Sequence, residues 1–419
     1  MANVLPKLSP PLVHYFEDCV GCAACAPSCP YYYVDHKYAP VDKAEFLRQM
    51  LRSKYTLAGK LLGRVVGAKI PRTDAEWWEV MQYAYRCADC GHCYTTCPFG
   101  IDSGAMVRRL REALYNAGYA PPVLNELNRL EKSGEYVTRS KGLWEDFVKS
   151  AGVPVGKKGA RVLLMVTLID LLLSRDVVLN AVKILRAAGE DFTLPERPLG
   201  VAPPLGAVVG DRESLRAVVS DIISYMEGLS PQYVVLISGC YQYPYFRFEA
   251  TDVLKRKFGF KVLHISELLY EYLKAGRLKL KKLGTSATLH DSCQLARRGG
   301  VVKEPREVLK AVVNYIEPKH GGLEAMCLGG GAGIALLAKD VREAIGKALG
   351  ISAKLDVREE KFVEELEGDY GKASRKGVDE LKKTGAEVVV ATCPLALAAL
   401  RASGLNAEHF VNVVASAVE

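Results

Sequence analysis

Hydrophobic and polar residues follow two different patterns along the chain. In its first third, apolar side chains recur at helical spacing over 41–67, 71–86 and 103–118. Thr73 and Asp74 precede one of these stretches and are typical of a helix start. The pattern predicts a mainly helical N-terminal part.

From about residue 158 the pattern changes to short apolar runs separated by helical stretches. Runs of this kind are typical of strands in a parallel sheet that is covered by helices on both faces. The predicted strands lie within 161–169, 232–239, 260–266, 286–292 and 387–394. We therefore expect an α/β fold for this part of the chain.

The α/β part contains an internal repeat. The run "QYVVLISGCYQYP" (232–244) parallels "AEVVVATCPLALA" (386–398), and each is an apolar strand that leads through a small residue to cysteine. Likewise "VAPPLGAVVG" (201–210) parallels "EAMCLGGGAG" (324–333), and both end in a glycine-rich bend. The repeat predicts two related halves, joined near 275–285.

These patterns together predict an α+β multidomain protein, in which a helical domain is followed by a duplicated α/β domain with parallel sheets. The expected parts are a helical domain at 1–120, a linker at 121–157, a first α/β half at 158–280 and a second half at 281–419. The charged stretch at 356–383 is interpreted as an insertion that carries a solvated helix.

Composition narrows the class of protein. Of the 419 residues, 49% are hydrophobic and 25% are charged, as in a folded protein in aqueous surroundings. Prolines near the N-terminus do not suit a signal peptide, and the apolar run at 162–173 is too short to cross a bilayer. We expect a cytoplasmic protein whose contact with a membrane is peripheral, through a partner.

Charge and polar composition add two further expectations. The net charge of +8 is modest for this length, and the basic runs at 255–257 and 277–282 lack an aromatic platform, so we expect no nucleic-acid partner. Asn and Gln are scarce, which is typical of proteins from thermophiles.

The strongest chemical signal is a pair of cysteine knots. The first is "CVGCAACAPSCP" (19–30) and the second is "CADCGHCYTTCP" (87–98), and both read CxxCxxCxxxCP. This is the spacing of ferredoxins that hold two [4Fe-4S] clusters. With 12 cysteines and no export signal, metal ligation is a better interpretation than disulfides.

In this spacing three thiolates wrap one cluster, and the fourth lies too far round to join them, so it reaches the neighbouring cluster. The first predicted ligand set is Cys19, Cys22, Cys25 and Cys97. The second is Cys87, Cys90, Cys93 and Cys29. The alternative is a pair of zinc sites, although zinc ligands usually come as CxxC pairs separated by a longer loop.

Four cysteines remain, and all lie in the α/β part. Cys240 and Cys393 each follow an apolar strand, where the carboxyl ends of parallel strands open onto a crevice. Cys293 lies in "LHDSCQLARR", and Cys327 lies beside "LGGGAG". Their matching loop positions predict one shared site.

Taken together, the paired ferredoxin motif, the duplicated α/β part and the "HDSCQLAR" stretch resemble the family of the heterodisulfide reductase D subunit. This family includes the iron-sulfur C subunit of anaerobic glycerol-3-phosphate dehydrogenase and related subunits of glycolate and lactate oxidases. The resemblance covers nearly the whole chain. It implies an anaerobic respiratory complex, with a flavoprotein or a membrane quinone-reactive subunit as partner, at the inner face of the cell membrane.

The family's cysteine-rich motif is only partly present. A complete domain has a first cysteine, a Cys-Cys-Gly doublet and a closing CxxC, which together can hold a noncubane cluster. Here Leu328 follows Cys327, and Ala396 stands where the closing cysteine is expected. In the first half Pro203 and Pro204 occupy the place of the doublet. The five thiolates therefore cannot be assembled.

Three interpretations of Cys240, Cys293, Cys327 and Cys393 stay open. They could hold a third iron-sulfur cluster, or a structural zinc ion, or they could be buried remnants without metal. His290 and Asp291 are candidates for an acid/base pair beside Cys293, although a helix cap is the plainer interpretation.

Arg297 and Arg298 follow in the same stretch and suit an anionic substrate or a partner carboxylate, or simply a solvated surface.

Three functions follow from these observations. The leading hypothesis is an electron-transfer subunit, whose two clusters relay electrons to or from a site in the α/β domain and on to a quinone, a partner subunit or a thiol/disulfide. The second is a catalytic heterodisulfide reductase. The third is a docking scaffold with zinc or no metal in the α/β domain. Whether the chain has an active site of its own stays open at this point.

Overall fold

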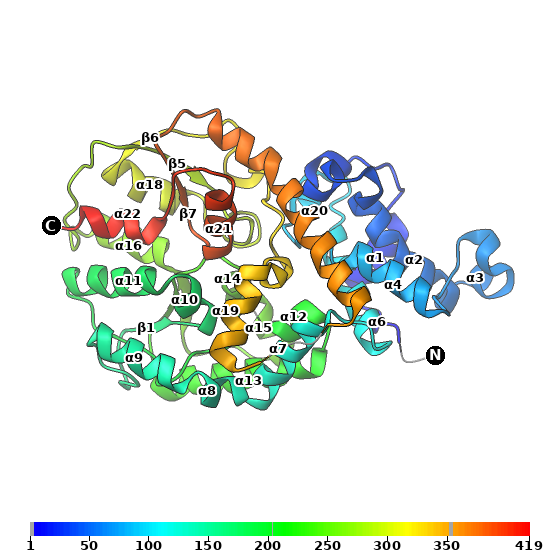
Figure 1. Cartoon of the computed structure of the whole chain (residues 1–419), viewed down its shortest axis with the longest axis horizontal. Coiled ribbons are helices and arrows are strands. Elements are labelled where there is room, and N and C mark those ends of the chain that lie inside the picture. The colour runs from blue at the N-terminus through cyan, green and yellow to red at the C-terminus, as the bar shows by residue number, and fades with distance from the viewer. Residues whose placement is uncertain (1–3, 203, 352–354) are drawn as a thin grey trace.

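The computed structural model describes residues 4–202, 204–351 and 355–419. Figure 1 shows a helical N-terminal part at the right and an α/β part with two sheets at the left. The mainly helical first part and the parallel α/β second part are both as predicted.

The described N-terminal part is built from six helices and short 3-10 turns. Thr73 and Glu76 form a capping box at the start of α4, so the predicted start signal is used. The predicted helix over 41–67 is broken at Thr56, whose side chain caps a second short helix. The helices are α1 (Pro10–Asp18), α2 (Pro40–Tyr55), α3 (Leu57–Leu62), α4 (Asp74–Ala84), α5 (His92–Thr96) and α6 (Ser103–Asn116).

The segment expected to be a linker, 121–157, is mostly helical. It contains α7 (Pro122–Ser133), α8 (Glu135–Arg139) and α9 (Lys141–Ala151), with glycines in left-handed conformation after α7 and α9. Side chains of α7 are buried in the same core as those of α6, and Phe147 of α9 is buried in the core of the α/β part. The segment therefore packs against both parts instead of running free between them.

Each half of the α/β part contains one four-stranded parallel sheet. The first sheet has the order β2-β1-β3-β4 and the second has the order β6-β5-β7-β8, so the two halves share one topology. This confirms the predicted duplicated α/β domain with parallel sheets. The strands are β1 (Val162–Met165), β2 (Phe192–Thr193), β3 (Tyr233–Leu236), β4 (Lys261–His264), β5 (Ser286–His290), β6 (Asn314–Tyr315), β7 (Val388–Ala391) and β8 (Ala407–His409).

Helices cover both sheets. Those of the first half are α10 (Leu168–Leu173), α11 (Arg175–Ala187), α12 (Leu205–Val209), α13 (Arg212–Leu229), α14 (Gln242–Pro244), α15 (Ala250–Leu254) and α16 (Ile265–Lys274). Those of the second half are α17 (Cys293–Ala296), α18 (Lys303–Val312), α19 (Lys339–Leu349), α20 (Val357–Lys382), α21 (Pro394–Ala402) and α22 (Phe410–Ala417).

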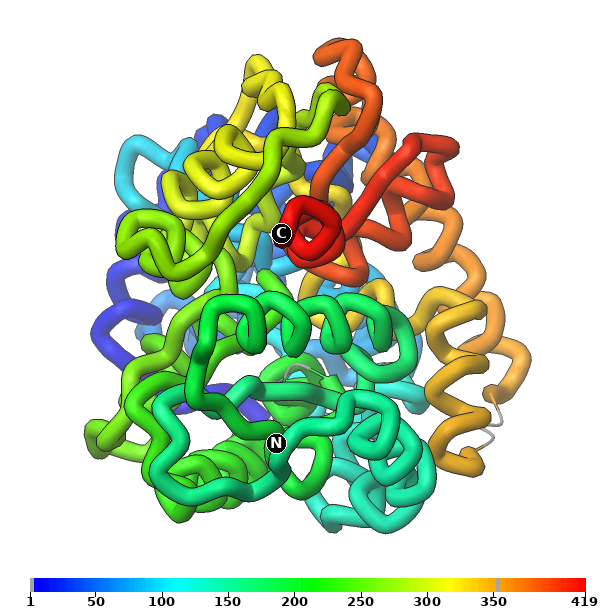
Figure 2. Tube along the Cα trace, turned by 90° about the vertical axis from the view of Figure 1, so that its left-hand side faces the viewer, coloured from blue at the N-terminus to red at the C-terminus, as the bar shows by residue number. Residues whose placement is uncertain are grey.

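The two halves share a core. Leu164 and Val235 of the first sheet belong to the same buried cluster as Leu289 and Val390 of the second. Helices α11 and α22 pack against each other across the junction, as Figure 2 shows at the centre of the molecule. The halves therefore form one packed unit.

Helix α20 corrects the interpretation of 356–383 as a solvated insertion. One face of this 26-residue helix is charged and exposed, whereas the other buries Phe362, Leu366 and Leu381. The helix packs on the turn at Pro30–Tyr33, which follows the first knot, and Figure 1 shows it between the two parts of the molecule. It therefore links the α/β part to the N-terminal part.

Within the described ranges, none of the helices combines the length and the apolar character that crossing a bilayer requires.

Candidate metal centres and a cysteine-lined crevice

The two knots share a backbone feature around their second cysteine. In each loop the residues on either side of the second cysteine have positive φ: Gly21 (72°) and Ala23 (57°) in the first, Asp89 (49°) and Gly91 (75°) in the second. Ala and Asp seldom adopt this left-handed conformation, and such residues cluster at functional sites. Turns of this kind direct successive N–H groups into a concavity that suits an anionic group.

The structure groups the eight knot cysteines into two sets. One cavity of about 350 Å³ is lined by the first three cysteines of the first knot together with Cys97 of the second. The other, of about 370 Å³, is lined by the first three cysteines of the second knot together with Cys29 of the first. The fourth cysteine of each knot thus faces the cavity of the other knot.

Burial disfavours the thiolate form of Cys25 and Cys87 unless a metal takes the place of the proton. It raises the pKa of Cys25 and the pKa of Cys87 to about 11. Lys43 partly offsets this cost, because its buried ammonium lies 3.4 Å from the Cys29 sulfur and donates to the Arg86 carbonyl at 2.6 Å. A buried cation beside thiolates favours their charged form. Eight thiols, inward N–H groups and a cation fit two anionic iron-sulfur clusters.

Within the described residues, no three His, Cys, Asp or Glu side chains converge closely enough to hold a single metal ion. A zinc ion needs four ligands at about 2.0–2.3 Å from one point. The thiols instead line the walls of cavities, an arrangement that suits the larger body of an iron-sulfur cluster better than one zinc ion.

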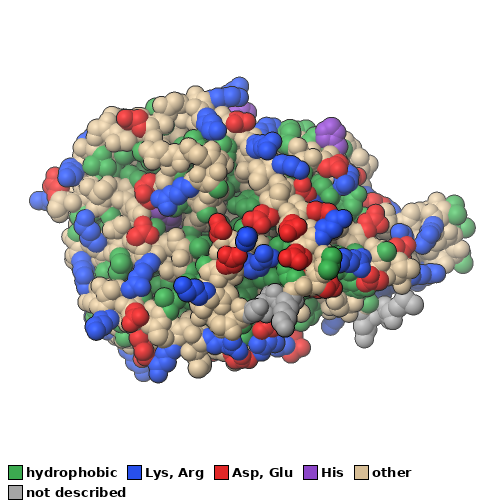
Figure 3. Space-filling view, viewed as in Figure 1, with side chains coloured by type: hydrophobic (Ala, Val, Ile, Leu, Met, Phe, Trp, Pro, Cys, Tyr) green, Lys and Arg blue, Asp and Glu red, His purple; other side chains and the backbone are tan. Residues whose placement is uncertain are grey.

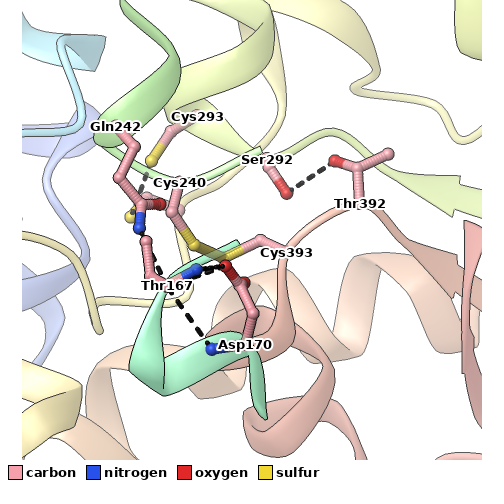
Figure 4. Close-up of a disulfide and its surroundings, with 9 residues drawn as sticks. Thr167, Asp170, Cys240, Gln242, Ser292, Cys293, Thr392 and Cys393 are labelled. Carbon is pink, nitrogen blue, oxygen red and sulfur yellow. Dashed lines mark hydrogen bonds between the residues drawn. A yellow bond between two sulfur atoms is a disulfide. The ribbon is translucent and has the colours of Figure 1, made fainter. Parts of the chain in front are cut away.

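The four cysteines of the α/β part line one crevice. Cys240 and Cys393 are joined as a disulfide, with their Cα atoms 5.7 Å apart (Figure 4). The sulfurs of Cys293 and Cys327 lie 3.9 Å apart. The shared location is as expected, but the expectation that the chain forms no disulfide is wrong for Cys240 and Cys393.

The disulfide joins equivalent positions of the two halves. Cys240 follows β3 and Cys393 follows β7, the third strand of each repeat. Next to it the Gly239 N–H donates to the Thr392 carbonyl at 2.6 Å, and Figure 4 shows the Thr392 hydroxyl donating to Ser292. The crevice therefore lies where the carboxyl ends of both sheets meet.

The crevice also adjoins the second knot. The thiol of Cys327 interacts with the thiol of Cys90, which lines the second knot cavity. Gln294 donates to the Asp89 carbonyl at 2.9 Å, and Gly331 lies so close that a Cβ there would be 2.2 Å from the Ala88 carbonyl oxygen. The glycine-rich bend is thus required for close backbone approach to the second knot.

Arg297 and Arg298 belong to this contact, so the interpretation as solvated side chains is corrected. Arg297 donates to the Cys90 carbonyl at 2.9 Å. Arg298 forms ion pairs with Asp89, at 2.7 Å, and with Asp102. Both arginines hold the helical domain against the α/β domain.

His290 and Asp291 have different surroundings. Asp291 forms a two-pronged ion pair with Arg306, at 2.8 and 2.7 Å, and accepts the Gly322 N–H at 2.6 Å. His290 lines the crevice, and neither ring nitrogen has a hydrogen-bonding partner in good geometry among the described residues. Burial lowers its pKa to about 4 against the opposing effect of Asp291. Asp291 thus has a structural partner, whereas His290 faces the site as a neutral imidazole.

Comparisons with known proteins agree with this arrangement. A family model described as "4Fe-4S dicluster domain" matches residues 15–101. The "Hdr-like menaquinol oxidoreductase iron-sulfur subunit 2" of Archaeoglobus fulgidus is 26% identical over 378 residues, covering 76% of this chain and 68% of that protein. The D subunit of "Dihydromethanophenazine:CoB--CoM heterodisulfide reductase" of Methanosarcina acetivorans is 26% identical over 335 residues, covering 76% of this chain and 78% of that protein.

These relatives match across both the helical and the α/β part. The chain is similar over most of its length to the heterodisulfide reductase D subunit and to Hdr-like iron-sulfur subunits. A further relative, the B subunit of "Fumarate reductase (CoM/CoB)" of Methanothermobacter marburgensis, is 25% identical over 346 residues, covering 79% of this chain and 62% of that protein. The chain thus spans between 62% and 78% of the length of these three relatives.

This chain lacks part of the cysteine-rich motif that the resemblance to the heterodisulfide reductase D subunit leads one to expect. Leu328 and Ala396 line the same crevice as the four cysteines, at the positions where further thiols are expected. Pro203 lies outside the described residues, and Pro204 precedes α12. The described crevice therefore offers two sulfur pairs and an apolar wall.

Two functional features went unnoticed in the sequence. Lys43 reads as one of many lysines in an amphipathic helix, and only the fold buries it beside Cys29. The pairing of Cys240 with Cys393 could have been suspected from their matching places in the repeat.

Proposed function

We propose that this chain is an iron-sulfur electron-transfer subunit of a multi-subunit, membrane-associated oxidoreductase. Electrons pass one at a time through two [4Fe-4S] clusters, to or from the crevice of the α/β domain. From there they reach a quinone, a partner subunit or a thiol/disulfide. The observation that carries the proposal is that the second knot adjoins the crevice: Gln294, which lines the crevice, donates to the Asp89 carbonyl at 2.9 Å, and Arg297 donates to the Cys90 carbonyl at 2.9 Å.

The ligand assignment follows the two cavities. Cys19, Cys22, Cys25 and Cys97 hold the first cluster, and Cys87, Cys90, Cys93 and Cys29 hold the second. When bound, each cluster supplies one-electron redox chemistry. Lys43 contributes a positive charge beside the Cys29 sulfur, which favours the more negative, reduced state of the second site.

Arg297 and Arg298 act as positioning residues. They fix the loop that carries Cys90 to the helix that carries Cys293, through the Cys90 carbonyl and the Asp89 side chain. Electron transfer falls steeply with distance, so a fixed contact between the second knot and the crevice is needed for a relay.

The expected partner subunits follow from the cofactors that this chain is not built to bind. In the described residues the glycine-rich bend at 329–333 follows no strand and packs on Ala88, so it is not placed to bind a dinucleotide. We therefore place any flavin on a partner subunit. A membrane subunit that reacts with a quinol fits the name of the Archaeoglobus relative, a menaquinol oxidoreductase subunit, and would hold this chain at the inner face of the membrane.

A catalytic disulfide reductase is the second candidate, and the crevice itself favours it. Its wall carries four cysteines, which are the side chains that thiol–disulfide exchange requires. The apolar side chains of Leu328 and Ala396 count against it, because they replace the thiols that a complete cysteine-rich site would have. A third cluster or zinc at this site would require the Cys240–Cys393 bond to open, because a disulfide sulfur is not a thiolate ligand.

The two candidates are distinguished by what reoxidises the reduced protein. The chain, loaded with iron and sulfide and reduced under anaerobic conditions, is mixed with a one-electron acceptor, with a short-chain naphthoquinone or with a disulfide of two small thiols. An electron-transfer subunit is reoxidised rapidly by the one-electron acceptor and does not turn over the small disulfide. Sustained cleavage of that disulfide by the chain alone would overturn the proposal in favour of the reductase.

A further inference from the structure

The crevice contains its sulfurs as two pairs. Cys240 and Cys393 are bonded to each other, whereas Cys293 and Cys327 are free thiols with sulfurs 3.9 Å apart. Both pairs face the same cavity, and the disulfide is buried, with 6% of Cys240 and 8% of Cys393 exposed. A disulfide within a thiol-lined cavity is placed for redox chemistry.

The disulfide does little that the packing does not already do. The two halves share one hydrophobic core, and α11 packs against α22 across their junction. The Gly239–Thr392 hydrogen bond ties the same two loops together at 2.6 Å. A purely structural crosslink at this place is therefore redundant.

A source of electrons lies beside the free pair. Cys327 contacts Cys90 on one side and Cys293 on the other. The crevice also supplies a proton carrier, because the unpartnered imidazole of His290 lines it. Electrons and protons thus reach the same cavity by separate side chains.

We propose that the Cys240–Cys393 disulfide is a redox centre that collects two electrons from the second knot cavity. Breaking the sulfur–sulfur bond takes two electrons and two protons and gives two thiols. The protons come from water through the crevice, and the [4Fe-4S] cluster that Cys87, Cys90, Cys93 and Cys29 would hold would supply the electrons one at a time. The inference rests on the proposed function, since the clusters supply the electrons.

Such a centre changes what the subunit can deliver. The clusters each carry one electron, whereas a dithiol carries two together. The crevice therefore converts single electrons into a pair, which an acceptor such as a quinone or a disulfide requires.

A reductive titration tests this directly. The cluster-loaded chain is titrated anaerobically with a calibrated reductant, and the clusters are followed by their visible and EPR signals. We expect wild type to take up about four electrons, two in the clusters and two in the disulfide, and a Cys240→Ser, Cys393→Ser double variant to take up about two. The cluster signals stay unchanged in the variant.

Alkylation followed by mass spectrometry is a second test, because it measures which cysteines are free thiols before and after reduction. Cys240 and Cys393 are protected before reduction and become alkylated after it, whereas Cys293 reacts in both states. A wild-type uptake of about two electrons, with both cluster signals present, would overturn the inference and leave the proposed function standing. About twelve irons per chain would overturn it in favour of a third cluster. Absence of both cluster signals would instead contradict the proposed function.

A separate observation concerns an arm that projects from the helical domain. It comprises α3 and the 3-10 turn Gly63–Val66, and it extends beyond the rest of the molecule at the right of Figure 1. Its apolar side chains point outward: 73% of Leu57, 74% of Leu61 and 87% of Val65 are exposed. Figure 3 shows hydrophobic side chains at the outer end of this projection.

The arm carries cations and no carboxylate. Its own charged residues are Lys60 and Arg64, and the residues on either side of it extend the stretch without Asp or Glu to 46–73. Arg64 pairs with Glu76 at 3.3 Å, so Lys60 gives the arm its net positive charge.

The base of the arm holds it in place. The Arg52 guanidinium donates to the Gly67 carbonyl at 2.9 Å and pairs with Glu45 at 2.6 Å. The Thr56 side chain caps α3. The exposed apolar residues are therefore presented on an ordered support.

We infer that this arm binds the surface of an anionic lipid bilayer. Apolar side chains flanked by cations are the combination that inserts shallowly among lipid headgroups, and anionic lipids complement the charge. The arm would add a direct contact to the peripheral association through partners that the sequence predicts.

Sedimentation with vesicles tests the arm. The cluster-loaded chain is mixed with phosphatidylcholine vesicles, with or without phosphatidylglycerol. Wild type is expected to bind the anionic vesicles, and a Leu57→Ser, Leu61→Ser, Val65→Ser variant to bind at least ten-fold more weakly with its iron content unchanged. Val357→Ser, which alters a residue 85% exposed outside the arm, is the matched control and should bind as wild type does. Failure of wild type to bind, or equal binding by the triple variant, would overturn the inference and point to a protein partner.

Discussion

Arg298 neutralises two buried carboxylates where the second knot meets the α/β domain. Its side chain is 17% exposed, and those of Asp89 and Asp102 are 4% and 7% exposed. Burial alone raises the pKa of Asp102, but Arg298 outweighs it and holds that pKa below its ordinary value. Arg298→Ala should therefore lower the free energy of unfolding by about 3–5 kcal/mol, because Asp102 loses its ion pair and Asp89 keeps only Arg108, at 3.3 Å.

Denaturant titration measures this loss, and iron content should fall with it, since Asp89 lies inside the second knot. Arg401→Ala is the control: its ion pair with Glu408 is exposed and should be worth less than about 1 kcal/mol. Equal effects of the two substitutions would contradict the assigned role of Arg298.

His264 and His409 end equivalent strands and cap the helices that follow. Each accepts a backbone N–H at its Nδ1, from Ser266 at 3.2 Å and from Val411 at 3.3 Å. Burial lowers the pKa of His264 to about 3 and that of His409 to about 4. Both lie below the unfolded value of about 6.5, so their contribution to stability is complete above that pH and is lost as the pH falls.

The free energy of unfolding should therefore fall between about pH 6.5 and 5.5, with each histidine contributing up to about 1.4 kcal/mol per pH unit. A His264→Asn, His409→Asn variant keeps a capping side chain but does not titrate. Its stability should depend less steeply on pH over this window. The same slope in both proteins would show that these imidazoles are not buried in the neutral form.

Helix α20 contains a matched pair of glycines. A Cβ at Gly377 would lie 2.9 Å from a methyl carbon of Leu328 and 3.1 Å from the Met326 carbonyl oxygen, whereas one at Gly371 would meet nothing within 4 Å. Gly377→Ala should destabilise the fold by about 1–3 kcal/mol through overpacking. Gly371→Ala should stabilise it by up to about 1 kcal/mol through helix propensity.

Thermal unfolding of the two variants distinguishes these effects. If both substitutions stabilised the protein, α20 would not pack on the loop that carries Cys327. Through this packing, α20 contacts the loop that lines the crevice.

At the level of helices and strands, the sequence predicts those elements whose position is set by a local pattern of apolar residues. The long apolar runs become β1, β3, β4, β5 and β7, whereas β2 and β6 have two residues each and carry no periodicity that could be read. The same limit applies to 121–157, whose three prolines and short helices resemble a linker. Tertiary packing decides both cases.

In the candidate site, too, features that are local in the sequence could be predicted, whereas features that depend on packing could not. Cysteine spacing within a knot is local, so the ferredoxin motif is visible in the sequence, and the crossed assignment of Cys29 and Cys97 stays a prediction that the two cavities support. The Cys240–Cys393 bond has a sequence separation of 153 and depends on how the halves pack. Arg298 acquires its role only through a contact between domains.

At the scale of the whole molecule, three parts meet around the second knot: the helical domain, the glycine-rich bend and the loop that carries Cys293. The route from the first knot cavity to the second and on to the crevice runs through this junction. The proposed path of electrons through the two knots therefore depends on which cysteines hold which cluster.

Serine substitutions read out by EPR test this most directly. In the cluster-loaded chain, Cys97→Ser should alter the same cluster signal as Cys22→Ser, and Cys29→Ser should alter the same signal as Cys87→Ser, with about eight irons in wild type. That result would support two clusters with exchanged fourth ligands. If Cys97→Ser instead altered the signal that Cys87→Ser alters, each knot would hold its own metal and the central claim would be contradicted.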